Sequence, residues 1–465
     1  MGVSHCLAKR IYTSSYDVPS SPLSLAGPSM QYTMMFGPMT SVPGFLRRWL
    51  VPPFKHPRAV PIEVTFDITT PQPTRKPVDR PLPRPPAHIP NELILYILQA
   101  GYSPDNTEPD HEMLMQCSLV SKDWSVLAQQ LLFSDVTLRT EPAYTSFQRA
   151  VDRSTPRGCM LGNAVTSLRV TLDPNHPQCL TERAFAQAVT LTPNLVTLRV
   201  AVYGQGAPGL DIIGSPAQQR MRRGAPSFDP TTLFILRSGP RIKTLQLSDW
   251  SDNPTSLVQL LDIWPSVQSL EICGTPPSLP SPSPEPCPCA LQELRINVQM
   301  PPSVDVLEWL TYNSKDTLRV LDLKREPEAE MLDYLLGEHS ATLESLSIPS
   351  AAASKVIINL LECFMLRELR VEKTKTARQI FNTLPVGLEH LALGVHGDVS
   401  LQPVLQFIKK TETLKTLTMH LWNGAESHEQ LDAVKIACAR QGVDLQFTKD
   451  IRTFRSISSH SASSI

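Results

Sequence analysis

The chain contains 465 residues and 44 prolines, which is about 9% proline against a usual share of about 5% and indicates long linkers. Lys plus Arg at 43 nearly balances Asp plus Glu at 44, so the formal net charge of −1 provides no global field for binding nucleic acid or an anionic membrane. The nine cysteines lack the paired spacing of a disulfide framework or a zinc site, and no apolar stretch is long enough for a transmembrane helix. We therefore expect a cytoplasmic and/or nuclear protein that binds its partners through local surfaces.

The N-terminal residues 1–86 are rich in proline and poor in periodic apolar positions. Ordering such a segment costs more conformational entropy than its burial returns. We therefore predict a disordered arm over these residues.

Three short helices are predicted next, over residues 87–131. Pro90 stands at a helix start, where its missing N–H is harmless, and apolar residues up to Leu98 are spaced along one helical face. Residues 113–120 and 122–130 have the same character, and the third run contains Trp124. Modules this small bury little apolar surface alone, so a partner or a neighbouring module is expected to complete them.

A repeat follows, with the pattern aliphatic-x-x-Leu-x-aliphatic occurring ten times. Its fourth-position leucines are Leu168, Leu198, Leu245, Leu270, Leu294, Leu321, Leu346, Leu369, Leu391 and Leu417. From Ile242 onward the hexamers begin 22 to 27 residues apart, within the period of about 20–29 residues that is typical of leucine-rich repeats. Each hexamer therefore predicts one strand of a parallel sheet, and residues 133–138 and 442–447 are candidates for the first and last strands.

Helices are predicted between the strands, several with Thr or Ser at the N-cap position. They cover residues 181–189, 255–264, 303–310, 353–364 and 429–440. The three aliphatics of one repeat contribute about 6 kcal/mol when buried, whereas ordering its residues costs roughly 25–50 kcal/mol, so repeats must stack.

The predicted fold class is therefore an α/β leucine-rich-repeat solenoid over residues 132–448, with its parallel sheet on the concave face. The Asn or Cys of regular repeats is missing after the strands, which predicts an irregular horseshoe. Loop insertions are expected at about 204–230 and 274–290, and residues 449–465 are expected to be a disordered Ser-rich tail.

Residues 88–133 resemble an F-box. The match is carried by Ile89-Pro90, Glu92-Leu93, Ile97-Leu98, Leu114, Cys117-Ser118-Leu119-Val120-Ser121-Lys122-Asp123-Trp124, Leu127-Ala128 and Leu132-Phe133. The resemblance implies a small helical module that docks on a Skp-family linker subunit and through it on a cullin. An F-box followed by leucine-rich repeats is similar to the substrate receptors of Skp–cullin–F-box ubiquitin ligases, which would make the partner of the repeats an unknown protein substrate.

On this resemblance the Skp-binding residues would be Pro90, Leu93, Ile97, Leu98, Leu114, Leu119, Val120 and Trp124. Two other interpretations stay open. The helices could be a plain cap that shields the end of the solenoid, and the whole chain could be an interaction scaffold unconnected with ubiquitin.

Substrate contacts are expected on the concave sheet, because the residue after each repeat leucine points away from the core. The candidates are Arg169, Arg199, Glu271, Arg295, Asp322 and Arg370. Arg169 and Arg199 would lie on neighbouring strands about 4.8 Å apart, where like charges repel unless an anion or a carboxylate lies between them. An acidic or phosphorylated substrate is one interpretation; the other is that both side chains splay into water or pair with the 204–230 insertion.

Enzyme motifs are weak in this sequence. Gly204 to Gly209 fit the pattern G-x-G-x-x-G, but Gly214 and Pro216 interrupt the helix whose N-terminus would hold a pyrophosphate. Cys287 and Cys289 have no second cysteine pair nearby. We therefore expect no cofactor, no metal and no catalytic activity, and neither nucleic acid nor membrane as a partner.

Overall fold

The computed structural model divides the chain into two units, Met1–Lys76 and Pro77–Ile465. The structure describes residues 89–102, 110–204, 227–251, 253, 255–350, 360–373, 380–381, 384–422 and 424–456. The predicted N-terminal arm lies outside these residues, as does most of the 204–230 insertion.

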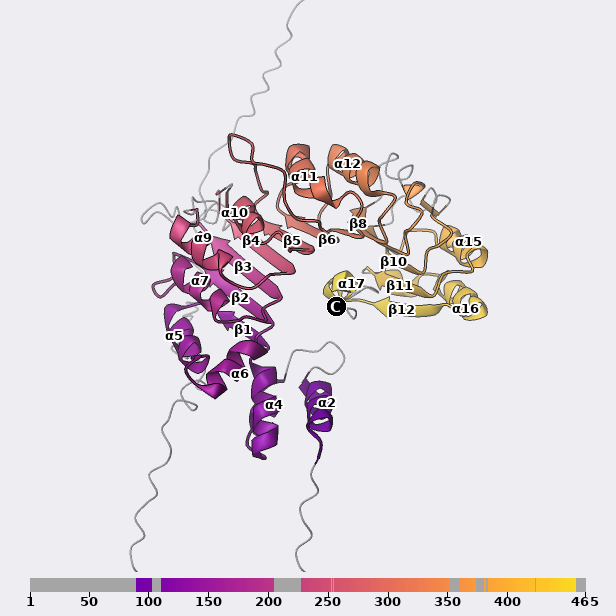
Figure 1. Ribbon diagram of the computed structural model, residues 1–465. Coiled ribbons are helices and arrows are strands. Elements are labelled where there is room, and N and C mark those ends of the chain that lie inside the picture. Colours follow the sequence, from indigo (N-terminus) through magenta and orange to yellow (C-terminus); the bar gives the residue numbers. More distant parts are fainter. Residues whose placement is uncertain are drawn as a thin grey trace, which may run out of the picture. The chain divides into compact units, whose positions relative to one another are not determined.

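Twelve parallel strands form one sheet, and their order in the sheet is their order in the chain (Figure 1). The strands are β1 (Asp135–Leu138), β2 (Ser167–Leu172), β3 (Thr197–Tyr203), β4 (Thr244–Trp250), β5 (Ser269–Gly274), β6 (Glu293–Val298), β7 (Val320–Leu323), β8 (Ser345–Ser350), β9 (Glu368–Lys373), β10 (His390–Val395), β11 (Thr416–Leu421) and β12 (Asp444–Thr448). The ten predicted hexamers supply β2 to β11, and the two candidate end segments supply β1 and β12.

The repeat leucines stand in register across the sheet. Leu168 pairs with Leu198, Leu198 with Leu245, and the row continues without a slip to Leu417. All ten leucines are fully buried in one continuous core. Burial of a leucine side chain contributes about 2 kcal/mol, so this row is a main stabilising element. The fold is the predicted α/β leucine-rich-repeat solenoid.

Helices connect most of the strands and cover one face of the sheet (Figure 1). They are α5 (Glu141–Ala150), α6 (Pro156–Ala164), α7 (Glu182–Thr190), α9 (Pro230–Arg237), α10 (Ser256–Ile263), α11 (Val304–Thr311), α12 (Ala329–His339), α15 (Gln402–Lys410) and α16 (Leu431–Gln441), with short 3₁₀ turns at Tyr312–Ser314 and Ala425–Ser427. Thr181 caps α7 as expected, its hydroxyl accepting the Ala184 N–H at 3.2 Å. Gly442, with φ of +70°, ends α16 in the left-handed region that favours glycine.

The link between β5 and β6 contains no helix, so the predicted 274–290 loop replaces a helix of the solenoid. Its prolines prevent helix formation. Cys287 and Cys289 are fully buried instead and fill the core position of the missing helix. Neighbouring side chains satisfy the loop's backbone, because Trp309 Nε1 donates to Glu285 O at 2.6 Å and Asn313 Nδ2 to Cys287 O at 2.7 Å.

The N-terminal helices of the second unit are α2 (Asn91–Tyr102), α3 (His111–Cys117) and α4 (Lys122–Leu132). They have a core of their own, formed by Ile94, Leu98, Leu114 and Ala128 and distinct from the core of the solenoid. A polar contact joins α4 to α6, in which Arg157 Nε donates to Gln129 Oε1 at 3.2 Å.

The expectation of a disordered tail is wrong for residues 451–456, which form the helix α17 (Ile451–Ser456). Asp450 caps this helix, accepting the Arg452 N–H at 2.9 Å and the Thr453 N–H at 3.2 Å. Side-chain contacts described below hold the helix against the sheet face opposite the other helices (Figure 1). Residues 457–465 lie outside the described part of the chain.

Candidate functional site

The three N-terminal helices expose a set of large apolar side chains, called here the module face. Its residues are Ile89, Leu93, Tyr96, Ile97, Leu119, Val120 and Val126, with exposed fractions from 43% to 83%. A small module with four buried core residues cannot cover these side chains by itself. Apolar patches of this kind mark contact sites for other proteins.

Two of the expected Skp-binding residues are not on this face. Leu98 and Leu114 are buried in the core of the module, so they support the helices and cannot contact a partner. Trp124 is half-buried and packs against the same core. Pro90 is exposed beside the face, which leaves Pro90, Leu93, Ile97, Leu119 and Val120 available, and Tyr96 joins them as a residue that the sequence analysis missed.

The row of residues after the repeat leucines changes character along the sheet. Arg169, in the second strand, is exposed. Its neighbour Arg199 is half-buried, and one of its guanidinium nitrogens lies 3.8 Å from Asp135 Oδ2 on β1. A carboxylate of the chain itself therefore offsets part of the like-charge repulsion between the two arginines. Asp135 is not among the residues expected from the sequence to line this surface.

In the middle of the row, Arg295 and Glu271 are half-buried. The Arg295 side chain donates through Nε to Glu293 Oε1 at 2.8 Å, and its second nitrogen contacts the same oxygen. Burial acts to lower the pKa of Arg295, but Glu293, Asp322 and Glu271 outweigh this effect and raise it. This part of the concave face is consequently a partly accessible surface on which one arginine lies among carboxylates.

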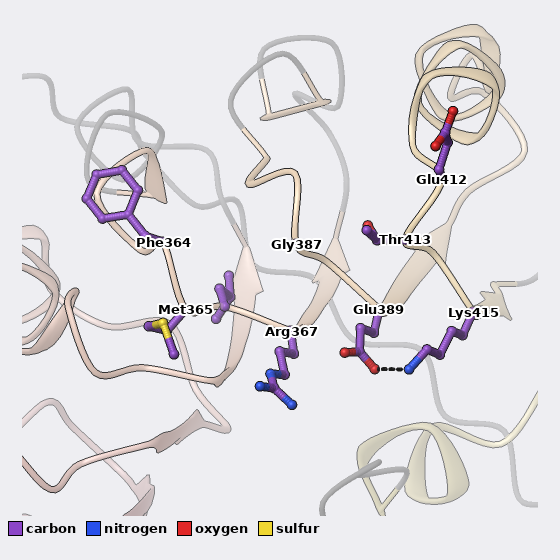
Figure 2. Close-up of a pocket in the computed structure, with 9 residues that line it drawn as sticks. Phe364, Met365, Arg367, Gly387, Glu389, Glu412, Thr413 and Lys415 are labelled. Atoms are coloured by element: carbon purple, nitrogen blue, oxygen red, sulfur yellow. Dashed lines mark hydrogen bonds and ion pairs between the residues drawn. The ribbon is translucent and has the colours of Figure 1, made fainter.

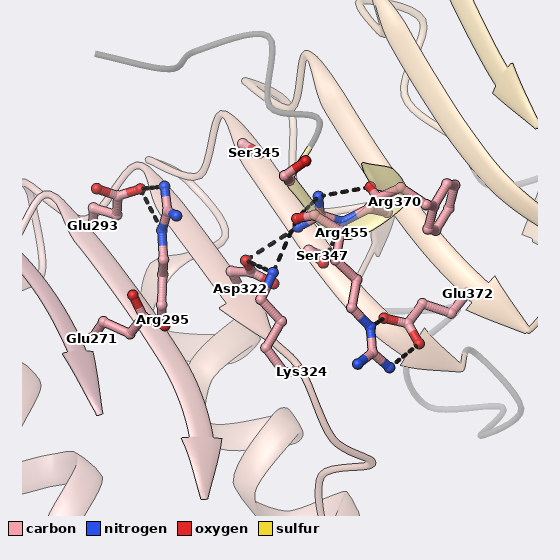
Figure 3. Close-up of polar contacts among 12 residues, drawn as sticks. Glu271, Glu293, Arg295, Asp322, Lys324, Ser345, Ser347, Arg370, Glu372 and Arg455 are labelled. Carbon is pink, nitrogen blue, oxygen red and sulfur yellow. Dashed lines mark hydrogen bonds and ion pairs between the residues drawn. The ribbon is translucent and has the colours of Figure 1, made fainter. Parts of the chain in front are cut away.

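Asp322 and Arg370 are buried, although both were expected on the open surface. Together with Lys324 and Glu372 they form what we call the concave charge cluster (Figure 3). Asp322 Oδ2 lies 2.7 Å from Lys324 Nζ and 3.1 Å from the Arg370 guanidinium, and Arg370 Nε donates to Ser347 Oγ at 2.8 Å. Burial acts to raise the pKa of Asp322, but Arg370 and Lys324 overcome it and hold that pKa below its ordinary value.

The helix α17 covers this cluster. The carbonyl of Arg455 accepts hydrogen bonds from Arg370 at 2.7 Å and from Lys324 at 3.1 Å. The Arg455 guanidinium in turn donates to both oxygens of Glu372, at 2.6 and 2.7 Å (Figure 3). Two donors on a planar fork make this a strong and directional contact. Asp322 and Arg370 thus cannot contact a substrate while α17 occupies this position.

One aromatic residue anchors α17. Phe454 is fully buried, and its ring centroid lies 5.4 Å from that of His420. His420 also contacts Trp422 edge to face at 4.7 Å. None of these three residues is among the candidates expected from the sequence.

A cavity of about 490 Å³ lies where β9, β10 and β11 begin (Figure 2). Its wall includes Phe364, which is largely exposed, and an ion pair of 2.6 Å between Lys415 and Glu389 that is open to solvent. The Thr413 hydroxyl donates to backbone carbonyls, among them that of Val386 at 2.6 Å. The cavity thus combines exposed apolar side chains with a solvent-open ion pair and a hydroxyl bonded to the backbone.

The described residues contain no group of three or more His, Cys, Asp or Glu side chains placed to hold a metal ion. Cys287 and Cys289 are both fully buried, and the hydrogen bond between them raises the pKa of the Cys289 thiol and lowers that of Cys287. Apart from Gly204, the glycine motif at 204–209 lies outside the described residues. Within the described ranges, every helix is too short or too polar to cross a membrane.

No family model matches the sequence, and no curated protein matches it. Among solved structures, the chain is similar to the crystal structure of a TLR13–ssRNA13 complex, with 13% sequence identity and a TM-score of 0.31. The match covers 62% of this chain and 46% of that chain. This chain therefore spans less than half the length of that protein.

Proposed function

We propose that this chain is the substrate-recognition subunit of a Skp–cullin–F-box ubiquitin ligase, located in the cytoplasm and/or the nucleus. In this proposal the module face docks on the Skp-family linker, the linker joins the chain to a cullin, and the solenoid holds a protein substrate. The chain itself catalyses no reaction and needs no cofactor. The observation that supports the proposal best is the exposed module face on helices that also carry the F-box-like sequence.

The separate core of the module argues against a plain cap. A cap exists to cover apolar side chains at the end of a solenoid, so its interior should be continuous with the solenoid core. Here Ile94, Leu98, Leu114 and Ala128 form their own cluster, and the polar pair Arg157 and Gln129 joins α4 to α6. The module face then stays free for another protein.

The solenoid half of the proposal is supported by the free part of the concave row. Arg169 is exposed, and Glu271 and Arg295 are partly accessible. These groups provide charges of both signs for a protein surface. Since Asp135 already accompanies Arg199, we favour a substrate with mixed charge over a purely acidic or phosphorylated one.

The proposal is tested with two full-length variants that each replace two exposed apolar residues by serine. Leu93→Ser with Val120→Ser removes two side chains of the module face, and we expect it to weaken binding of a purified Skp-family subunit at least about 30-fold, because central apolar contacts contribute about 2 kcal/mol each. Phe364→Ser with Val386→Ser alters two exposed apolar residues of the solenoid and should leave that binding unchanged. Isothermal titration calorimetry measures both.

A second candidate function is an interaction scaffold unconnected with ubiquitin. The observation in its favour is the apolar surface near the Figure 2 cavity, where Phe364, Met365 and Val386 are exposed. If the unaltered chain fails to bind the Skp-family subunit, and affinity purification yields neither that subunit nor a cullin, the scaffold becomes the better account.

A further inference from the structure

The C-terminal segment crosses the concave face instead of continuing the solenoid. After β12 the chain turns at Asp450, and α17 contacts strands that precede it by several repeats. The Arg455 carbonyl is bonded to Lys324, 131 residues earlier, and to Arg370, 85 residues earlier. The segment therefore lies on the surface where a solenoid of this class is expected to hold a partner.

The contacts of α17 are those of a bound ligand more than those of a core helix. Phe454 is fully buried, yet it does not belong to the hydrophobic core cluster of the solenoid. The other contacts of α17 include charge-assisted hydrogen bonds to Arg370, Lys324 and Glu372. One aromatic anchor beside one arginine anchor is the usual composition of an energetic hot spot in a protein interface.

If α17 were removed, the helix α16 would still cover the main core at the C-terminal end of the solenoid. The helix α16 packs against the last strands with Leu431, Val434, Ala437 and Cys438, all of which belong to the main core. The surface beneath α17 consists mainly of charged groups, which water solvates well once they are exposed. Release of the segment therefore breaks its own contacts, and the main core, to which Phe454 does not belong, is left in place.

We propose that the concave charge cluster and His420 form a binding site for a peptide segment in which an aromatic residue is directly followed by arginine, and that α17 occupies this site within the same chain. The aromatic ring packs on His420, the guanidinium binds Glu372 through two hydrogen bonds, and the backbone carbonyls accept from Arg370 and Lys324. A partner protein that carries such a segment displaces α17. This inference goes beyond the function proposed above and does not depend on the module face.

The site extends past the end of α17. A cavity of about 100 Å³ next to Ser456 is lined by polar side chains, including those of Arg295, Ser345 and Glu368. A competing segment would consequently place a small or polar residue after its arginine.

The factor by which α17 weakens the binding of a separate peptide to the same site can be calculated. A tethered segment has an effective concentration of about 1 mM, so a peptide with a dissociation constant near 10 μM would bind about 100-fold more weakly while α17 is in place. A natural partner must offset this roughly 100-fold weakening by binding the site more tightly than the peptide does or by also binding a second site on the chain.

The test uses a fluorescent peptide with the sequence of residues 449–458 and the full-length chain. In the double variant Phe454→Ala with Arg455→Ala, the segment within the chain loses both anchors, and we expect the peptide to bind at least tenfold more tightly than it binds the unaltered chain. Adding Glu372→Arg to that variant should remove the gain, because it repels the arginine of the peptide. Fluorescence anisotropy gives the three affinities.

Arg452→Glu is the matched control, since Arg452 is an exposed arginine of the same helix. This variant should bind the peptide as weakly as the unaltered chain does. The proposal is overturned if the double variant and the unaltered chain bind the peptide equally, or if Glu372→Arg leaves the gain intact. It is also overturned if the double variant loses cooperative thermal unfolding, because α17 would then be part of the fold.

Discussion

Asp322 and Arg370 occupy the same kind of position as Arg169, yet they are buried and Arg169 is exposed. Strand alternation places all three on the concave side, and it carries no information about what covers that side. Burial of a charge is costly unless it is paired, and both residues have charged partners within 3.1 Å. The cover that excludes water from them is a distant part of the chain.

His420 makes the attachment of α17 depend on pH. Burial lowers the pKa of His420 below its ordinary value of 6.5, and the Arg455 charge acts in the same direction, against Glu372, Asp450 and the Thr448 backbone. The neutral ring is thus favoured while Phe454 covers it. The resulting stabilisation of the attached α17 is complete above pH 6.5. It is lost as the pH falls through the lowered pKa of His420.

We therefore expect the amides of residues 451–456 to be less protected from hydrogen exchange at pH 5.5 than at pH 7.5, after correction for the intrinsic pH dependence. His420→Asn, which cannot titrate, should abolish the difference. Equal protection at the two pH values in the unaltered chain would contradict this assignment.

At the scale of single elements, the helix caps differ in a way that can be measured. Thr181 caps α7 through its hydroxyl, whereas Ser303, at the same position of α11, makes no side-chain cap hydrogen bond. Both residues are exposed. Thr181→Ala should lower the free energy of unfolding by about 1 kcal/mol, and Ser303→Ala by only about 0.3 kcal/mol. Urea denaturation of the two variants checks the difference, and equal losses would refute it.

The strands could be predicted because each contains one leucine that is buried whether or not the segment that links it to the next strand is a helix. The register of Leu168 through Leu417 follows from the spacing alone. The helices are less determined: Thr181 caps α7 as expected, whereas the β5 to β6 link buries Cys287 and Cys289 in place of a helix. A proline-rich segment indicates a loop, but its sequence does not show that two of its cysteines are buried in the core.

The module face could be predicted only in part. Leu93 and Ile97 form one pair four residues apart, and Ile94 and Leu98 form a second pair directly beside it on the same helix. The sequence does not distinguish which pair meets α4. The structure buries the second pair and exposes the first.

The helix α17 was missed because serine dominates the composition of the tail. The local signal was present in Asp450, whose carboxylate caps the N–H groups of Arg452 and Thr453. Its contact with Lys324 spans 131 residues, and no local pattern in the sequence reports a contact of that length.

At the scale of the second unit, two cores of very different size lie next to each other. The solenoid core runs from Leu138 to Val443, and the module core contains four buried residues. Small cores give low stability, so the module should open more readily than the repeats. The contact of Arg157 with Gln129 is polar and contributes about 1 kcal/mol, less than the burial of one core leucine.

Leu114→Ala tests this independence. Leu114 is fully buried in the module core, and its truncation should cost about 2–5 kcal/mol, which is enough to open helices α2 to α4. Hydrogen exchange should then show loss of protection across these helices, with β2 to β11 as protected as before. Leu294→Ala, an equal truncation within the repeats, should instead reduce protection around β6 and leave the helices of the module unchanged. Loss of protection in β1 to β4 of the Leu114→Ala variant would mean that the module caps the solenoid, and the case for a free docking face would fail with it.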